Sequence, residues 1–160
     1  MDPLMNAGFT AVLTNPLLTG ISGAATTYSY SEFIVSLRGK MTTVAADSAQ
    51  ATPTTDIITG AAYVSLAASQ GCVFLWLTKP DGTLAVAQGP VKALKADNLF
   101  QWDASMFPGI PDGYVPFAYV VVKNGSTGSA WVFGTGNWNA TGIVVAVQNL
   151  CTLPDRVQVA

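Results

Sequence analysis

Apolar and polar residues alternate along this chain in short runs, which is the pattern of β-strands rather than of helices. A crossover helix would need ten or more residues with a period of 3.6, and only Gly60–Ala68 comes close. The sequence therefore predicts an all-β fold, a sandwich or barrel of short antiparallel strands. The expected strands are Tyr28–Tyr30, Phe33–Leu37, Met41–Val44, Tyr63–Ala67, Cys72–Leu77, Leu84–Gln88, Val91–Leu94, Tyr114–Lys123, Ser129–Phe133 and Gly142–Leu150.

Turn residues between these runs predict how the strands connect. Pro80-Asp81-Gly82 lies between two apolar runs and predicts a hairpin, because proline presets one backbone dihedral and glycine takes the positive one. Asn124-Gly125 opens a second turn, and Pro116 confines the first half of its strand to an edge or a bulge. Loops are expected at Ala49–Asp56, which is rich in Thr and Pro, and at Gly134–Thr141.

The first part of the chain has a different composition from the rest. No charged residue lies between Asp2 and Glu32, and prolines and glycines interrupt any long helix. An uncharged, partly apolar segment is a poor free tail, so we expect residues 1–27 to form an extended arm that docks on a neighbouring subunit. Residues 28–160 would form the β-domain, with a short C-terminal tail. The candidate partner-binding side chains are Leu4, Phe9, Val12, Leu13, Leu17 and Leu18.

Charge is scarce over the whole chain. Charged residues make up 10% of it, against about 25% in a typical soluble domain, and the net charge is -2. Since no basic stripe is present, we expect no binding to nucleic acid. A weakly charged surface offers little repulsion between copies, which favours a homo-oligomer. No membrane-spanning segment is expected, because the longest apolar stretch, Tyr114–Val122, is too short and is interrupted by Pro116. No signal peptide is expected, because the N-terminus lacks a basic region and a compact apolar core.

The side chains needed for common catalytic sites are missing. The chain has no histidine, and Glu32 is its only glutamate, so histidine-based nucleophile activation and most zinc sites are excluded. Gly134-Thr-Gly136 lacks the third glycine and the helix of a dinucleotide fingerprint. We expect no enzyme activity and no catalytic, metal-binding or cofactor-binding residues. Cys72 and Cys151 lie in or beside apolar runs and are expected to be buried, reduced thiols.

The tryptophans fall into two groups. Trp76 lies in a dense apolar run, and Trp131 alternates with Phe133, so these are expected in the core or in a subunit interface. Trp102 and Trp138 lie in expected loops beside polar residues. They are either surface aromatics of a sugar-binding or protein-binding face, or side chains that close the ends of the barrel.

Several stretches, taken in their order from about residue 45 to 158, resemble the small β-rich structural proteins of phage virions. These proteins include head decoration (cement) proteins and components of head or tail fibres. The stretches are Ala51-Thr-Pro-Thr-Thr-Asp56, Gly71-Cys-Val-Phe74, Gln88-Gly-Pro-Val-Lys-Ala-Leu94, Pro116-Phe-Ala-Tyr-Val-Val-Val-Lys123 and Leu153-Pro-Asp-Arg156.

This resemblance implies a protein that is made in the host cytoplasm and ends up on the capsid surface of the virion. Its partners would be the major capsid protein and its own copies, in a homotrimer or similar oligomer, and it would stabilise the head by binding between capsomers. The first alternative is a fibre-associated carbohydrate-binding or receptor-binding module that uses Trp102 and Trp138. The second is a tail tube or connector subunit, which would form rings. The family offers no catalytic residues to transfer to this chain.

Overall fold

The computed structural model describes residues 10–21, 23, 26–95 and 104–151. Within these ranges all regular structure is β, apart from one short 3-10 helix, η2 (Ala104–Met106), and this confirms the predicted all-β class. No helix in the described ranges is long and apolar enough to cross a membrane. The strands are β1 (Ala11–Val12), β2 (Thr27–Tyr30), β3 (Phe33–Leu37), β4 (Lys40–Val44), β5 (Asp47–Ala51), β6 (Gln70–Thr78), β7 (Leu84–Gln88), β8 (Lys92–Ala93), β9 (Val115–Asn124) and β10 (Ile143–Asn149).

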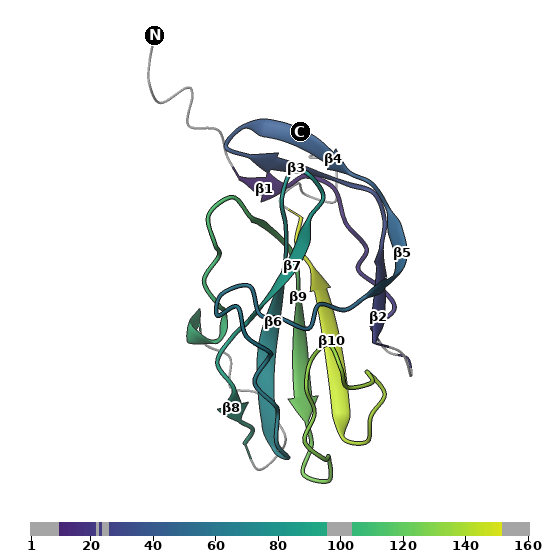
Figure 1. Cartoon of the computed structure of the whole chain (residues 1–160), viewed down its shortest axis with the longest axis vertical. Helices are drawn as coiled ribbons and strands as arrows, with labels where there is room; N and C mark the ends of the chain where they lie inside the picture. The colour runs from purple at the N-terminus through teal and green to yellow at the C-terminus, as the bar shows by residue number, and fades with distance from the viewer. Residues whose placement is uncertain (1–9, 22, 24–25, 96–103, 152–160) are drawn as a thin grey trace, which may run out of the picture.

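The strands form three antiparallel sheets. The largest is five-stranded, with the order β10-β9-β6-β7 and with β8 paired to β6. A three-stranded sheet has the order β1-β3-β4, and β2 pairs with β5 alone. In Figure 1 the long strands β6, β9 and β10 run side by side, while β1, β3 and β4 lie across one end of them and β2 and β5 lie along one side.

Strands β6 and β9 lie at the centre of the large sheet because most of their residues are buried on both faces. All of β6 from Gly71 to Thr78 is buried, as expected for a strand covered on both sides. On β9 the pairing with β6 shifts register next to Pro116, and β10 ends opposite Ala118, before the proline is reached. This register shift between β6 and β9 confirms the predicted bulge.

The predicted hairpin joins β6 to β7. The N–H of Lys79 donates to the carbonyl of Thr83 at 2.9 Å, and the N–H of Gly82 donates to the carbonyl of Lys79 at 3.0 Å. Gly82 has φ of 84°, the left-handed conformation that its turn position requires. The carboxylate of Asp81 accepts the N–H of Thr83 at 2.9 Å, and this hydrogen bond lowers the pKa of Asp81.

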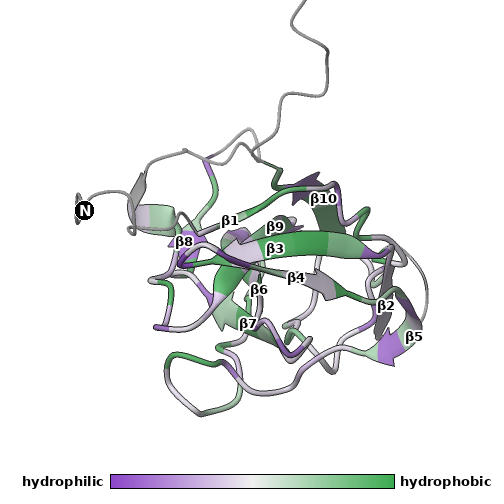
Figure 2. Ribbon diagram, turned by 90° about the horizontal axis from the view of Figure 1, so that it is seen from above, coloured by the Kyte–Doolittle hydropathy of each residue, from purple (hydrophilic) through white to green (hydrophobic). Residues whose placement is uncertain are grey.

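Aromatic rings join the small sheets to the large one. The ring of Tyr28 on β2 lies edge-on to Trp76 on β6, with centroids 4.6 Å apart, and Phe33 on β3 stacks on Phe117 of β9 at 5.1 Å. Such pairs contribute stability beyond the area that they bury. Figure 2 shows how the sheets lie relative to one another: the apolar β3 crosses over the large sheet, and the hydrophilic end of β5 lies at the outside. The small sheets thus cover one face of the large sheet, as in a sandwich.

Two expected strands are replaced by loops. In Tyr63–Ala67 the backbone of Val64 is satisfied by a side chain, because its N–H donates to the amide oxygen of Gln88 at 2.7 Å and its carbonyl accepts from the amide nitrogen at 2.9 Å. Ser129–Phe133 pairs only through the single bridge of Trp131 to Leu66. Conversely, the first residues of the predicted loop Ala49–Asp56 belong to β5, because pairing with β2 satisfies their backbone groups.

Candidate functional site

The structure places two of the candidate partner-binding residues in the core of their own chain. Val12 is 2% exposed and Leu18 is 4% exposed, and both belong to the main hydrophobic cluster. Leu13 is half-buried, while Leu17 is 50% exposed. Val12 and Leu18 are therefore unavailable to a partner, which corrects that part of the prediction. Leu4 and Phe9 lie outside the described residues.

Hydrogen bonds also fasten this part of the expected arm to its own domain. Thr10 and Thr14 accept, through their hydroxyl oxygens, the N–H groups of Arg38 at 3.1 Å and of Ile34 at 2.8 Å. The N–H of Leu18 donates to the side chain of Asn149 at 2.9 Å. Residues 10–18 are thus part of the β-domain, and the segment of the predicted arm that precedes this anchor is residues 1–9.

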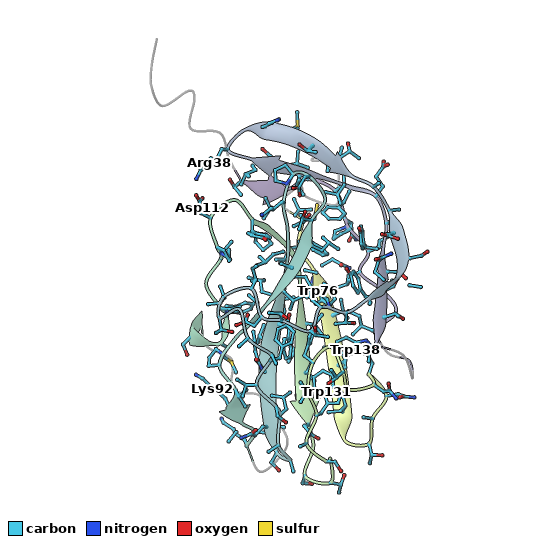
Figure 3. The ribbon with its side chains drawn as sticks, viewed as in Figure 1. Arg38, Trp76, Lys92, Asp112, Trp131 and Trp138 are labelled. Carbon is cyan, nitrogen blue, oxygen red and sulfur yellow. The ribbon has the colours of Figure 1, made fainter. Side chains whose placement is uncertain are left out.

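Trp138 is buried, so the interpretation as a surface aromatic is wrong for this residue. It is 2% exposed, and its ring lies 5.5 Å from that of Trp131 and 5.4 Å from that of Phe133. Figure 3 shows Trp131 and Trp138 close together toward the end of the sandwich away from Arg38. The indole N–H of Trp131 donates to the carbonyl of Asn137 at 3.0 Å and so holds the loop over the core. Trp102 lies outside the described residues.

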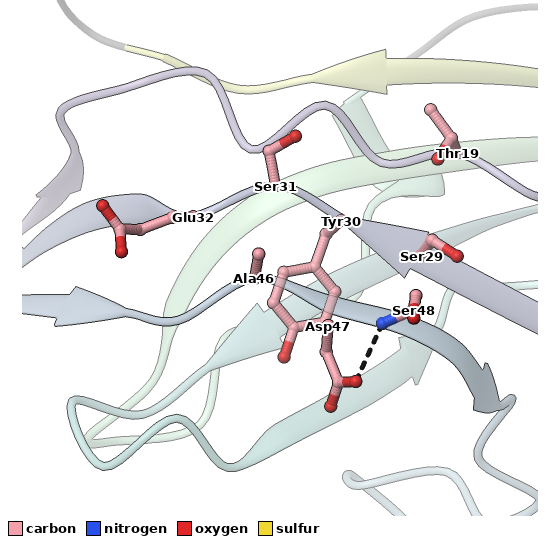
Figure 4. A pocket seen from close by; sticks show the side chains of 8 residues that line it. All are labelled: Thr19, Ser29, Tyr30, Ser31, Glu32, Ala46, Asp47 and Ser48. Atoms are coloured by element: carbon pink, nitrogen blue, oxygen red, sulfur yellow. Dashed lines mark hydrogen bonds between the residues drawn. The ribbon is translucent and has the colours of Figure 1, made fainter.

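A polar pocket of about 410 Å³ opens between β2 and β5 (Figure 4). Two carboxylates, Glu32 and Asp47, line it together with hydroxyl groups. Asp47 accepts hydrogen bonds from the N–H of Ser48 at 2.8 Å and from the side chain of Gln50 at 2.9 Å. Burial and the neighbouring Asp47 carboxylate raise the pKa of Tyr30, so its phenol stays neutral. The remaining lining residues are Thr19, Ser29, Ser31 and Ala46.

This pocket offers hydrogen-bond acceptors and hydroxyl groups, which suit a ligand rich in hydroxyl or ammonium groups. No local pattern reveals this pocket, because Glu32 lies in the link between β2 and β3 whereas Asp47 begins β5, and only the pairing of β2 with β5 brings both to one pocket. In the part of the chain that the structure describes, no three His, Cys, Asp or Glu side chains lie close enough together to hold a metal ion.

The two cysteines differ in environment. Cys72 is buried, and its thiol donates to the carbonyl of Gly89 at 3.0 Å. Burial raises the pKa of Cys72 to about 12, so the thiol is protonated and inert at neutral pH. Cys151 is exposed, and the expectation that both thiols are buried is wrong for it.

The surface combines few charges with several exposed apolar side chains. Among the described residues a single ion pair is present, between Arg38 and Asp112 at 2.6 Å, and both side chains are exposed to solvent. An exposed pair of this kind adds little stability. In the part of the chain that the structure describes, the large apolar residues that remain exposed are Leu17, Met41, Ile58, Val64, Phe107, Ile110, Val144 and Val147.

Two of these residues, Val144 and Val147, lie on β10, and sequence reasoning did not single them out. One signal could have revealed this surface, because no charged residue lies between Lys123 and Asp155. That run covers all of β10 and is as free of charge as the start of the chain. A strand with no charge at either end has no electrostatic protection against other strands.

A comparison with protein-family models, with characterised proteins and with solved structures finds no match for this chain.

Proposed function

We propose that this chain is a structural protein of a phage virion, specifically a capsid decoration (cement) protein that stabilises the head by binding between capsomers. The observation that carries the proposal is the charge-poor surface on which large apolar side chains, such as Met41 at 66% exposed, remain uncovered. Such surfaces are typical of proteins that bind other proteins. The resemblance of the sequence to β-rich virion proteins directs the proposal to the capsid.

A cement protein needs contact area rather than reactive groups. A stable protein–protein interface buries roughly 1,200–2,000 Å², and an obligate oligomer buries more. Because charged groups contribute little to this surface, attachment to the capsid should depend weakly on ionic strength. The proposed partners are the major capsid protein and further copies of this chain, in the trimer or similar oligomer that the resemblance implies.

Residues 1–9 are the part of the predicted arm that can reach a neighbour without unfolding the domain, since residues 10–18 are bonded to β3 and to Asn149. Fully extended, such a segment spans about 30 Å. After Asp2 it carries no charge, and Leu4 and Phe9 supply apolar side chains. Its ordering upon docking would cost conformational entropy that the contacts made on the capsid must offset.

Deletion of residues 1–9 tests the proposal. Full-length and shortened proteins would be mixed with heads that lack this protein, and occupancy would be measured by cosedimentation and electron microscopy. We expect the full-length protein to occupy the heads in 0.1 M and in 1 M salt. The shortened protein should keep its circular dichroism spectrum and lose occupancy.

A deletion of residues 152–160, of the same length at the other end, serves as the control. Failure of the full-length protein to bind heads would refute the capsid assignment. Full occupancy by the shortened protein would refute the role of the arm alone.

A second candidate function rests on the polar pocket between β2 and β5. A fibre-associated carbohydrate-binding module would use Glu32 and Asp47 to accept hydrogen bonds from sugar hydroxyls, in place of the tryptophans that the sequence suggested. A glycan array probed with the protein and with the Glu32→Gln and Asp47→Asn variants tests this function. Glycan binding that both variants lose would favour the fibre module. Rings of the purified protein seen by electron microscopy would instead favour a tail tube or connector subunit.

A further inference from the structure

The outer edge of β10 has unpaired backbone groups. Gly125 donates to the carbonyl of Gly142, and Leu150 donates to the carbonyl of Phe117, each at 2.8 Å. These two bonds fall in the same register as the pairing of β9 with β10, so the even-numbered residues of β10 are bonded to β9. The odd-numbered residues therefore direct their N–H and C=O groups to the other side of the strand.

Within the described part of the chain, these outward groups find few partners. The N–H of Ile143 is used by a turn, since it donates to Ala140 at 2.9 Å, and the carbonyl of Asn149 accepts from the side chain of Gln148 at 3.1 Å. No bond to the outward groups of Val145 and Val147 is found among the described residues. The central part of β10 therefore has backbone groups that are available to pair with another strand.

The side chains of β10 provide no protection for this edge. Val144 is 55% exposed, Val147 is 37% exposed, and Ala146 and Gln148 are also exposed. The strand pairs with β9 without any bulge, and it contains neither lysine nor proline. Natural proteins use these devices to prevent strands from pairing between molecules, and a long apolar edge without them is ready for a further strand.

The opposite edge of the same sheet is covered. Residues of the turn that follows Asp56 lie along β7, where the N–H of Ile57 donates to the carbonyl of Val86 at 3.1 Å. The N–H of Gln88 donates to the carboxylate of Asp56 at 3.1 Å, and the hydroxyl of Tyr63 donates to the same Val86 carbonyl at 3.2 Å. The turn and Tyr63 therefore occupy two of the outward groups of β7, the carbonyl of Val86 and the N–H of Gln88.

The smaller sheets protect their outer strands with charge or irregularity. β4 begins with the charged Lys40, and β5 begins with the charged Asp47. The pairing of β5 with β2 contains a register shift, and Ala49 on β5 has a positive φ of 54°. Of the long edges in the described structure, that of β10 is left without such a device.

We propose that β10 is a self-association site, at which a second copy of this chain adds its own β10 in antiparallel orientation. Because the outward groups belong to odd-numbered residues, Val145 of one copy would exchange both backbone bonds with Val147 of the other. The two-fold axis would then pass beside Ala146. A second copy suits this edge because β10 is neutral along its length and therefore repels itself nowhere. The two five-stranded sheets would become one continuous sheet.

This inference concerns the isolated protein and does not rest on the capsid proposal. A pair formed at β10 is compatible with a trimer built through another surface, in which case β10 would join neighbouring trimers. The test therefore uses no capsids, and its failure leaves the capsid experiment unaffected.

The substitution Ala146→Lys places two like charges next to each other at the two-fold axis, where pairing would be opposed. Sedimentation equilibrium should show pairing of the original chain, with a dissociation constant at least about 10-fold higher for this variant. The matched control is Ala68→Lys, which adds the same charge at an exposed turn residue. Equal effects of the two lysines, or a chain that does not self-associate, would overturn the proposal.

Crosslinking gives a second readout that does not depend on the lysine variant. With Cys151 replaced by serine, Ala146→Cys would place two thiols in a non-hydrogen-bonded pair whose Cα atoms are about 4.5 Å apart, which a disulfide can bridge. Mild oxidation should crosslink this variant, while Ala68→Cys in the same background should remain uncrosslinked.

Two results would count against a second copy as the partner. One is a failure of Ala146→Cys to crosslink faster than the control. The other is self-association that appears only after residues 1–9 are deleted, because the occupant of the edge would then be that segment.

Discussion

Leu17 and Leu18 are adjacent residues of the same type, and they allow a direct test of where this part of the predicted arm belongs. Leu18 is 4% exposed and lies in the main cluster, whereas Leu17 is 50% exposed. If the segment belongs to its own domain, Leu18→Ala should be costly and Leu17→Ala nearly neutral. Leu17 has φ of 47°, but alanine also carries a Cβ, so this substitution leaves the backbone strain unchanged.

The expected magnitude follows from the burial of Leu18. Replacing a buried leucine by alanine removes apolar surface from the core and leaves a cavity, which costs about 2–5 kcal/mol. The N–H of Leu18 keeps its bond to Asn149, because that bond belongs to the backbone. We expect a loss of about 3 kcal/mol for Leu18→Ala and less than about 0.5 kcal/mol for Leu17→Ala.

Urea unfolding followed by tryptophan fluorescence measures both variants. At an m-value of about 2 kcal/mol/M, the expected loss moves the midpoint of Leu18→Ala by about 1.5 M. The measurement should be repeated over a 100-fold range of protein concentration. Equal midpoints for the two variants, or a midpoint of Leu18→Ala that falls on dilution relative to the original chain, would show that Leu18 packs against another subunit and would refute the reasoning.

Three further predictions concern single residues. Gly134→Ala should destabilise the fold by more than about 1 kcal/mol, because Gly134 has φ of 82° and a Cβ there would clash with a carbonyl of the facing loop. Gly82→Ala should cost less, because Gly82 has a similar φ of 84° but faces open space. Thermal melts of both variants check this, and equal costs would contradict it. A thiol reagent at pH 8 should label Cys151 rapidly and Cys72 only in denaturant, and rapid labelling of two thiols in the native protein would contradict the burial of Cys72. Burial raises the pKa of Tyr28 to about 12, so the unfolded chain loses the phenol proton at lower pH than the folded chain. The free energy of unfolding should therefore fall as the pH rises above about 10. Urea titrations that show no fall between pH 9 and pH 11 would argue against this prediction.

Local signals in the sequence were sufficient for much of the large sheet. Pro80-Asp81-Gly82 predicted the hairpin of β6 and β7, and the proline at 116 predicted the bulge on β9, because both depend on the backbone preferences of the residues themselves. The charge-free stretch before Glu32 is equally visible in the sequence. Apolar character alone, however, does not say whether a segment packs on its own domain or on a neighbour, so Val12 and Leu18 were assigned to the wrong surface.

Other features depend on contacts between distant parts of the chain. Trp138 lies in a loop with polar neighbours, yet it is buried because the loop folds back over Trp131 and Phe133. The pocket at Glu32 and Asp47 arises from the pairing of β2 with β5, and that pairing has no local signal. The bare edge of β10 also becomes visible only when the order of strands is known.

The turn at Asp56 has a consequence for the size of any assembly built by adding strands. A sheet that can add a strand at both edges can polymerise without limit and produce fibrils. A sheet that can add a strand at only one edge forms a pair and stops there. The Asp56 carboxylate accepts hydrogen bonds from the N–H groups of Ile58, Thr59 and Gln88. These bonds hold the turn against β7, at the edge where a further strand would otherwise pair. If strands add at β10 as proposed, this turn would limit the assembly to a pair of sheets, in a protein with very little charge repulsion of its own.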